Sequence, residues 1–140
     1  MTRTTIEDEA RQRDAGLPVP PSVLVVEDDA HTRRLFTYVL SQVYRVEAVP
    51  GIEEALSRAA EEAFDAFLLD IHLRERRTGI DLLRALREQP AYRGAPAVAC
   101  TAYAMPGDGS QFLAAGFDGY VSKPFTKVGL LEALASALTR

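Results

Sequence analysis

Acidic side chains follow two short apolar segments of this chain, at the point where each segment ends. Glu27, Asp28 and Asp29 follow Val-Leu-Val-Val, and Asp70 closes the run Phe-Asp-Ala-Phe-Leu-Leu-Asp. Neighbouring like charges destabilise each other unless a cation or hydrogen bonds offset the repulsion, so a cation site is one interpretation. Ordinary capping is the other, because acidic residues are favoured at helix N-termini and in turns.

Two further polar side chains end apolar segments later in the chain. Thr101 closes Ala-Pro-Ala-Val-Ala-Cys-Thr, and Lys123 follows Gly-Tyr-Val-Ser. Lys123 and Lys127 are the only lysines in an arginine-rich chain. An ammonium is a compact charge on a flexible stem, so we interpret Lys123 as a site residue and Lys127 as a solvated helix-start residue. Thr101 alone is equally well explained as a β-branched strand residue.

The elements that position these side chains alternate between strand and helix. Short apolar runs predict five strands at about Ser22–Glu27, Arg45–Val49, Phe64–Asp70, Ala95–Thr101 and Asp118–Ser122. Helical periodicity predicts five helices at about residues 30–42, 52–63, 79–90, 106–115 and 126–138, with Gly116 as the stop of the fourth. The alternation predicts an α/β fold, a doubly wound five-stranded parallel sheet in the order 2-1-3-4-5 with helices on both faces.

This topology brings the polar strand ends together. The carboxyl ends of parallel strands lie at one edge of the sheet, and neighbouring strands are about 4.8 Å apart. The carboxylates of Glu27, Asp28 and Asp70 are therefore expected in one crevice, flanked by the Thr101 hydroxyl and the Lys123 ammonium. Because each of these polar groups comes from a strand end at the same edge, the pattern favours a site over separate caps.

Composition limits the class of protein. The 140 residues are 47% hydrophobic and 26% charged, which predicts one domain over residues 22–140 after a mobile tail over residues 1–21. A net charge of -4 argues against a nucleic-acid surface. No apolar run approaches the roughly 20 residues of a membrane span, and the N-terminal stretch lacks a secretory signal. With the single Cys100 in an apolar run, we expect a cytoplasmic protein without a membrane or nucleic-acid partner.

Four motifs resemble the receiver domains of two-component response regulators, in particular single-domain receivers and those of hybrid histidine kinases. They are Val-Leu-Val-Val-Glu-Asp-Asp, Leu-Leu-Asp-Ile, Cys-Thr-Ala-Tyr and Gly-Tyr-Val-Ser-Lys-Pro-Phe, and the resemblance covers about residues 22–140. It implies a flavodoxin-like fold and a phosphorylation-activated signalling switch in a phosphorelay. It also implies that the protein is no enzyme beyond self-catalysed phosphoryl acceptance and dephosphorylation.

The resemblance gives each acidic residue a role. Asp70 is expected to accept a phosphoryl group from a phosphohistidine of a histidine kinase or a histidine phosphotransfer protein. Glu27, Asp28 and Asp70 are expected to hold Mg²⁺, together with the backbone carbonyl of His72. Magnesium takes oxygen ligands, commonly one or two carboxylates plus phosphate oxygen, which favours that carbonyl over the His72 imidazole.

The resemblance also assigns a switch. Thr101 and Lys123 are expected to contact the phosphoryl oxygens, and Tyr120 matches the aromatic residue whose rotamer reports activation. The Lys123–Pro124 bond matches a position that is often cis in this family. His72 and Tyr103 are expected to border the path of the water that hydrolyses the acyl phosphate.

The last helix and the neighbouring fifth strand are expected to bind a downstream effector protein, and the same face allows a weak homodimer. The periodicity predicts two apolar stripes on this helix. One faces the sheet and contains Val128, Leu131, Leu134 and Leu138; the other lies near solvent and contains Leu130, Ala133 and Ala137.

The loop after Asp70 departs from the family pattern. Arg74 stands where receivers usually carry a proline, and the loop is one residue longer before Gly79. Its arginines are expected to be solvated and to raise the positive potential beside Asp70. Two alternative functions remain: a magnesium-dependent nucleic-acid enzyme of the toprim kind, whose Asp-x-Asp pair is missing after Asp70, and a degenerate receiver that binds partners without phosphorylation.

Overall fold

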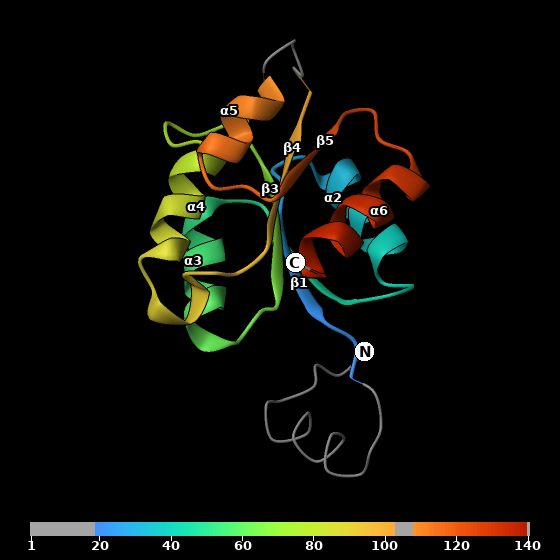
Figure 1. Cartoon of the computed structure of the whole chain (residues 1–140). Helices are drawn as coiled ribbons and strands as arrows, with labels where there is room; N and C mark the ends of the chain where they lie inside the picture. The colour runs from blue at the N-terminus through green and yellow to red at the C-terminus, as the bar shows by residue number, and fades with distance from the viewer. Residues whose placement is uncertain (1–18, 103–107, 140) are drawn as a thin grey trace.

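The computed structural model describes residues 19–102 and 108–139, in which five parallel strands form one sheet (Figure 1). The strand order is β2-β1-β3-β4-β5, which confirms the predicted topology. Each strand ends at or within one residue of its predicted end, and the bounds are β1 Ser22–Val26, β2 Arg45–Val49, β3 Ala66–Asp70, β4 Ala97–Thr101 and β5 Gly119–Ser122. The predicted starts of β3 and β4 were two residues too early.

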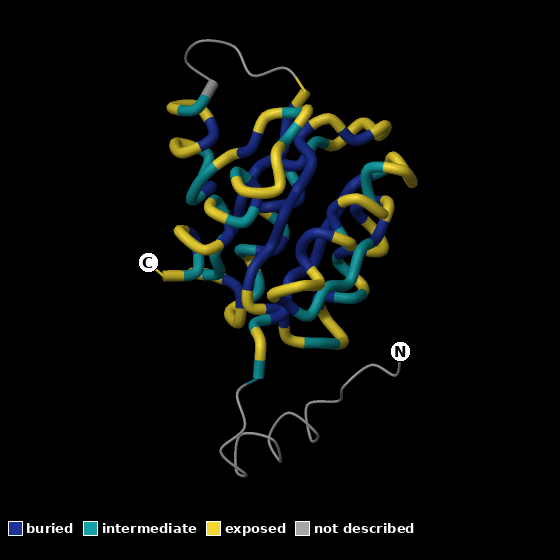
Figure 2. Tube along the Cα trace, turned by 90° about the vertical axis from the view of Figure 1, so that its right-hand side faces the viewer, coloured by how far each residue is buried: buried dark blue, intermediate teal, exposed yellow. Residues whose placement is uncertain are grey.

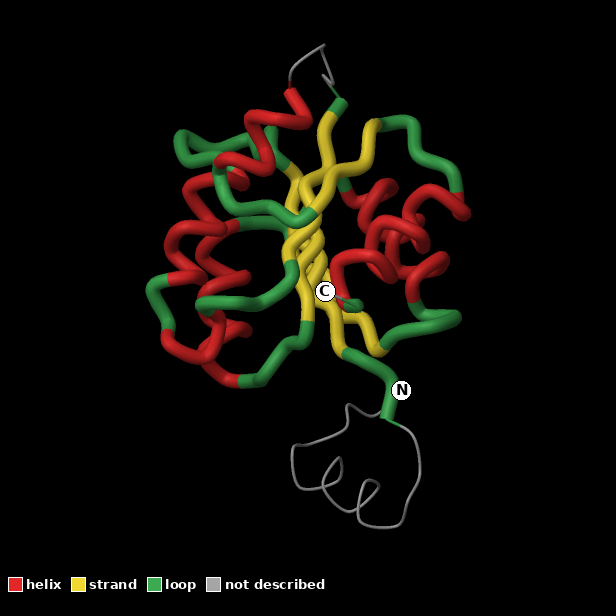
Figure 3. The backbone as a smooth tube through the Cα atoms, in the orientation of Figure 1, coloured by secondary structure: helices red, strands yellow, loops and turns green. Residues whose placement is uncertain are grey.

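Helices cover both faces of the sheet. In Figures 1 and 3, α3, α4 and α5 lie on one side of the strands and α2 and α6 on the other. A short 3-10 helix, Pro90–Tyr92, follows α4. The bounds are α2 Ala30–Leu40, α3 Ile52–Glu61, α4 Gly79–Arg87, α5 Asp108–Ala114 and α6 Lys127–Leu138. Pro106, the predicted start of the fourth helix, lies outside the described residues.

The strands alternate their side chains between two hydrophobic clusters, as the period of two requires. In β1, Leu24 and Val26 pack toward α3, α4 and α5, whereas Val23 and Val25 pack toward α2 and α6. The central strands β1, β3 and β4 are buried at every residue, whereas the edge strands β2 and β5 are mostly not, and buried strands run through the middle of the tube in Figure 2. Strands buried on both faces leave little place for polar side chains, so the polar groups of the central strands gather where these strands end.

Local capping fixes where the helices begin and end. The Asp29 side chain accepts the backbone N–H of Thr32 at 2.8 Å at the start of α2. Thr78 and Asp81 form a reciprocal capping box at the start of α4. Gly116 adopts a φ of 108° after α5, which confirms the predicted glycine stop.

The predicted faces of α6 were only partly right. Leu134 is buried as predicted, and Leu131 and Leu138 pack against the cluster on the α2 and α6 side. Val128, however, is 63% exposed, and Leu130 and Ala137 of the predicted solvent stripe are buried. Thr126 caps this helix by accepting the N–H of Gly129 at 2.9 Å. Because α6 is apolar around much of its circumference, its periodicity could not identify the buried face.

No helix in the described ranges combines the length and the apolar character needed to cross a bilayer. The Lys123–Pro124 peptide bond is cis, as the resemblance implied.

Candidate functional site

Three carboxylates converge at the carboxyl edge of the sheet. The β1–β3 register pairs Val26 with Leu69, so the residues that follow, Glu27 and Asp70, lie side by side. Glu27, Asp28 and Asp70 each offer an oxygen within 4.8 Å of the others. They border a hollow of about 290 Å³. Hard, anionic oxygens at this spacing fit the ligand preference of Mg²⁺.

Lys123 supplies a positive charge inside this cluster. Its Nζ lies 2.6 Å from Glu27 Oε1 and 3.3 Å from Asp70 Oδ2. Burial raises the pKa of Glu27 to about 7, and the hydrogen bond from Lys123 opposes that rise. Burial alone would lower the pKa of Lys123, but the Glu27 contact and the charge of Asp70 outweigh it, so this pKa is raised. The ammonium therefore stays charged and partly offsets the acidic cluster.

Asp70 is buried at the end of β3, and both of its carboxylate oxygens have partners. Oδ1 accepts the backbone N–H of His72 at 3.1 Å, and Oδ2 faces Lys123. The backbone N–H of Ile71 continues the ladder to the Cys100 carbonyl at 2.9 Å. His72 also borders the carboxylate hollow. The role of its carbonyl as a metal ligand stays a prediction.

Thr101 lies beside this site but faces another hollow. The register pairs Asp70 with Cys100, so Thr101 is the next residue of β4, and it is fully buried. It follows Ala97 and Ala99, whose side chains pack toward α3, α4 and α5. Among described residues, Ala102 and not Thr101 lines the carboxylate hollow.

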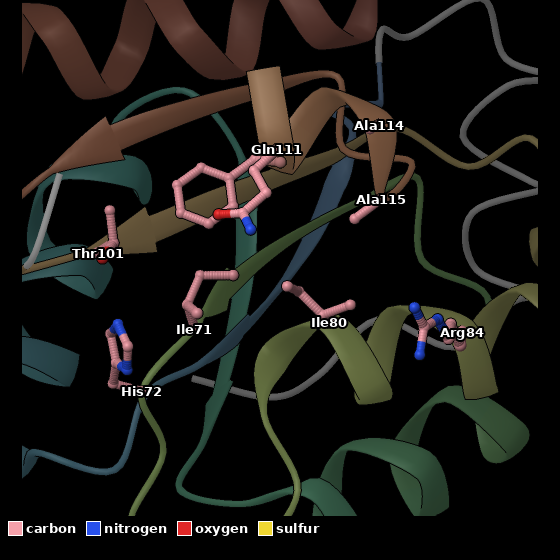
Figure 4. A pocket seen from close by; sticks show the side chains of 9 residues that line it. Ile71, His72, Ile80, Arg84, Thr101, Gln111, Ala114 and Ala115 are labelled. Carbon is pink, nitrogen blue, oxygen red and sulfur yellow. The ribbon is translucent and has the colours of Figure 1, made fainter. Parts of the chain in front are cut away.

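The hollow that Thr101 borders has a volume of about 520 Å³ and lies between β4, the residues after β3, and α4 and α5. Figure 4 shows Thr101 and His72 at one end of it and Arg84 at the other, with Ile71 and Ile80 between them. Space therefore exists on the side of Thr101 that faces α5, next to the residues that follow Asp70.

Tyr120 points partly into solvent from β5. Tyr120 is 44% exposed, and its ring centroid lies 5.9 Å from that of Phe112 in α5. A Cβ added to Gly109 would lie 2.7 Å from Tyr120 Cε1, so this glycine leaves room for the ring. Tyr120 therefore contacts α5, the same helix that borders the hollow next to Thr101.

Sequence reasoning did not predict three sets of contacts that hold the acidic cluster. Arg74 donates its backbone N–H to Asp28 Oδ2 at 3.0 Å. Arg33 Nη1 donates to the Glu27 and Asp28 carbonyls at 2.9 and 3.1 Å. The Asp29 N–H donates to Glu27 Oε2 at 3.1 Å. The signal in the sequence for the Arg74 contact was its position, where receivers usually carry a proline.

Tyr103, the other predicted neighbour of the water path, lies outside the described residues.

Comparison with known proteins gives a consistent result. The family model described as "Response regulator receiver domain" matches residues 23–135. The response regulator PhoP of Pseudomonas aeruginosa is 42% identical over 119 residues, which are 84% of this chain and 51% of PhoP. The chain therefore spans about half of that relative. The polar-differentiation response regulator DivK of Brucella anthropi is 32% identical over 86% of this chain and 98% of its own length.

Solved structures show the same fold. The chemotaxis response regulator CheY4 of Vibrio cholerae superimposes with a TM-score of 0.79 and 29% identity, covering 86% of this chain and all of that one. The BeF3-activated receiver domain of DrrB gives a TM-score of 0.74 at 28% identity, covering 87% of this chain and 100% of that one. Nothing in these comparisons supports the toprim alternative.

Proposed function

Because the chain belongs to the response regulator receiver family, whose members are phosphorylation-dependent signalling switches, we propose that Asp70 is the residue that accepts the phosphoryl group. One observation carries this assignment. The buried Asp70 carboxylate lies between two other carboxylates and the Lys123 ammonium, at the edge of the sheet where ligands of such folds bind.

The proposed reaction moves one phosphoryl group. An Asp70 carboxylate oxygen attacks the phosphorus of a phosphohistidine, a P–O bond forms and the P–N bond breaks. The histidine leaves as a neutral imidazole that takes the electron pair of the P–N bond and keeps the proton already on its other ring nitrogen. A water later attacks the same phosphorus, breaks the P–O bond to Asp70 and releases inorganic phosphate. A carboxylate is a suitable nucleophile only where nearby cations offset the charge of the phosphoryl group. Lys123 supplies one such charge.

Mg²⁺ is the cofactor that the donor set favours. Glu27, Asp28 and Asp70 would hold it, with the His72 carbonyl as a further oxygen donor. When bound, the ion supplies positive charge that reduces the repulsion between the carboxylates and the phosphoryl group. Lys123 remains beside Glu27 and Asp70 to bind a phosphoryl oxygen through its ammonium.

Thr101 and Tyr120 form the proposed switch. Phosphorylation adds roughly two negative charges and three acceptor oxygens next to the end of β4. Movement of the Thr101 hydroxyl toward them would leave space on the α5 side, where a hollow already exists and where Tyr120 packs. The Thr101→Ala variant should still be phosphorylated but should lose the changes in amide NMR signals of β5 and α6.

The partners follow from this chemistry. A histidine kinase or a histidine phosphotransfer protein would supply the phosphoryl group, and a downstream effector would bind the face made by β5 and its flanking helices. Exposed apolar side chains on this face support that location, because Leu113, Tyr120 and Val128 are 54%, 44% and 63% exposed. We further propose that catalysis is limited to self-phosphorylation and self-dephosphorylation of one domain that begins near Ser22, acting in the cytoplasm.

Mass spectrometry tests the assignment of Asp70. With Mg²⁺ and acetyl phosphate, the protein should gain one phosphoryl group, which hydroxylamine should remove because the product is an acyl phosphate. Asp70→Asn should abolish this gain. Asp65→Asn is the matched control, since Asp65 binds Ser22 at the start of β1, at the other end of the strands. Equal phosphorylation of the Asp70 variant and the wild type would contradict the proposal.

A further inference from the structure

One of the proposed metal ligands is already bound by a cation from a loop. Arg74 donates its backbone N–H to Asp28 Oδ2 at 3.0 Å, and its Nε lies 3.4 Å from the same oxygen. The Asp28 side chain is 18% exposed, whereas that of Arg74 is 87% exposed. A side chain so open to solvent is held by few other contacts, so its guanidinium can leave Asp28 without disturbing the core.

The same loop, residues 71–78, is tied to α3 by two further contacts. Glu75 Oε2 accepts the backbone N–H of Ile52, at the start of α3, at 3.0 Å. Arg77 Nη2 lies 2.6 Å from Glu53 Oε1. The loop therefore joins the acidic cluster at Arg74 to the first turn of α3.

We propose that Arg74 competes with Mg²⁺ for Asp28, so that this arginine lowers metal affinity and metal binding releases the middle of the loop. The inference rests on the proposed function, because it takes Asp28 as a ligand of the ion. A divalent cation and a guanidinium are attracted to the same carboxylate and repel each other. By linkage, the factor by which the Arg74–Asp28 contact weakens Mg²⁺ binding is also the factor by which bound Mg²⁺ weakens that contact.

The contact has two parts that substitution can separate. Alanine at position 74 removes the guanidinium and keeps the backbone N–H, whereas proline removes both donors. The exposed ion pair should contribute little, as such pairs do in water. The N–H contact adds to it because hydrogen bonds to an ionised acceptor are the stronger kind.

The test is a titration with Mg²⁺ alone, followed by calorimetry and by amide NMR signals at low ionic strength. Arg74→Ala should bind Mg²⁺ about 2- to 5-fold more tightly than the wild type, given the range found for exposed ion pairs. Arg74→Pro should bind about 10-fold more tightly, since the charge-assisted N–H bond is also lost. Arg76→Ala is the matched control, because it removes the same charge from an exposed position in the same loop.

The amide signals add a readout that does not depend on affinity alone. In the wild type, Mg²⁺ should shift the Arg74 amide, which loses its carboxylate acceptor, and then the Ile52 amide through Glu75. If Arg74→Ala and Arg76→Ala bind Mg²⁺ equally, only the net charge of the loop matters and the proposal is wrong. Weaker binding by Arg74→Ala would also overturn it, because Arg74 would then be positioning Asp28 for the metal.

The outcome is separable from that of the proposed function. If Asp70 is not phosphorylated but Arg74→Ala still tightens Mg²⁺ binding, competition for Asp28 stands and the acceptor assignment fails. If Asp70 is phosphorylated while the Arg74 and Arg76 variants bind Mg²⁺ equally, the acceptor assignment stands and the competition fails. Absence of Mg²⁺ binding in every variant would overturn both the metal site and the role of Arg74.

Discussion

Lys123 and Arg74 both contact the acidic cluster, but the fold holds them in different ways. Lys123 directly follows β5, its backbone N–H donates to the Thr101 carbonyl at 2.8 Å, and its side chain is only 23% exposed. Arg74 lies in a loop, and its side chain is 87% exposed. The sheet fixes the first cation, whereas the second can exchange with a metal ion. A permanent counter-charge at Glu27 and Asp70 and an exchangeable one at Asp28 thus serve neighbouring carboxylates of one cluster.

The surroundings also make the two contacts unequal in strength. Charges interact more strongly where water is excluded, and Lys123 lies between Glu27 and Asp70, both of which are buried. Water and salt screen the exposed Arg74 pair. The comparison therefore predicts that loss of Lys123 affects folding, whereas loss of Arg74 mainly affects what the site binds.

The largest expected effect concerns the glycine that brings the loop back to β3. A Cβ added to Gly79 would lie 2.3 Å from the Asp70 carbonyl oxygen, which is backbone and cannot move aside cheaply. Gly79→Ala should lower the free energy of unfolding by about 3 kcal/mol, the upper range for an overpacked site. Urea unfolding measures this change. Gly94→Ala is the control, since a Cβ there meets nothing within 4 Å, and it should stay within about 0.5 kcal/mol.

Equal losses of unfolding free energy in the two glycine variants would contradict the close approach of Gly79 to the Asp70 carbonyl. They would also contradict the course of the loop that brings Arg74 to Asp28.

The next effect tests the Lys123 side of the comparison. Lys123→Ala leaves the buried Glu27 and Asp70 without their counter-charge and should cost about 2 kcal/mol of unfolding free energy at pH 8, less than for a fully buried pair. Lys127→Ala, at the exposed start of α6, should change it by less than about 0.5 kcal/mol. Urea titrations without metal compare the two. If only Lys127→Ala lowered the free energy of unfolding, the assignment of Lys123 as the site residue and Lys127 as a solvated residue would be wrong.

A third prediction separates Glu27 from Asp28 by pH. The pKa of Glu27 is raised to about 7 by burial, so its carboxyl holds a proton in the folded protein from about pH 7 downward. Mg²⁺ must displace that proton, and its apparent affinity should therefore fall as the pH falls below 7, approaching about tenfold per pH unit. Titrations at pH 6 and pH 8 measure the slope.

Two variants show which carboxylate is responsible. Glu27→Gln should weaken binding but remove most of the difference between pH 6 and pH 8. Asp28→Asn should weaken binding and keep that difference, because Glu27 is retained. A slope that survives in Glu27→Gln would mean that another group releases the proton.

The sequence was sufficient to predict where the strands end and what stands there. Apolar runs closed by Glu27, Asp70 and Thr101 are local signals, and a parallel sheet leaves one place for such ends to meet. The buried face of α6 was only partly predictable, because apolar residues stand around much of its circumference. Hydrophobic periodicity cannot identify the buried face of a helix that is apolar around much of its circumference.

The contacts of loop 71–78 were not predictable either. Glu75 binds the N–H of Ile52, 23 residues away, and Arg74 binds Asp28, 46 residues away. Such a path depends on which distant groups need partners once the sheet has formed, and no repeat in the loop encodes it. The departure at Arg74 marked the loop as unusual without indicating what it would contact.

The smallest expected effect concerns the far anchor of the loop. Arg77 and Glu53 are exposed, so Arg77→Ala should change the free energy of unfolding by less than about 0.5 kcal/mol. Its value lies in a double-mutant cycle with Arg74→Ala, with Mg²⁺ affinity as the readout. If the loop moves as one piece between Asp28 and α3, the two changes should be non-additive, because loosening one anchor alters what the other can hold. Strictly additive effects would show that only the Arg74 side chain separates from Asp28, while the rest of the loop stays bound to α3. The exchangeable part of the site would then be a single side chain.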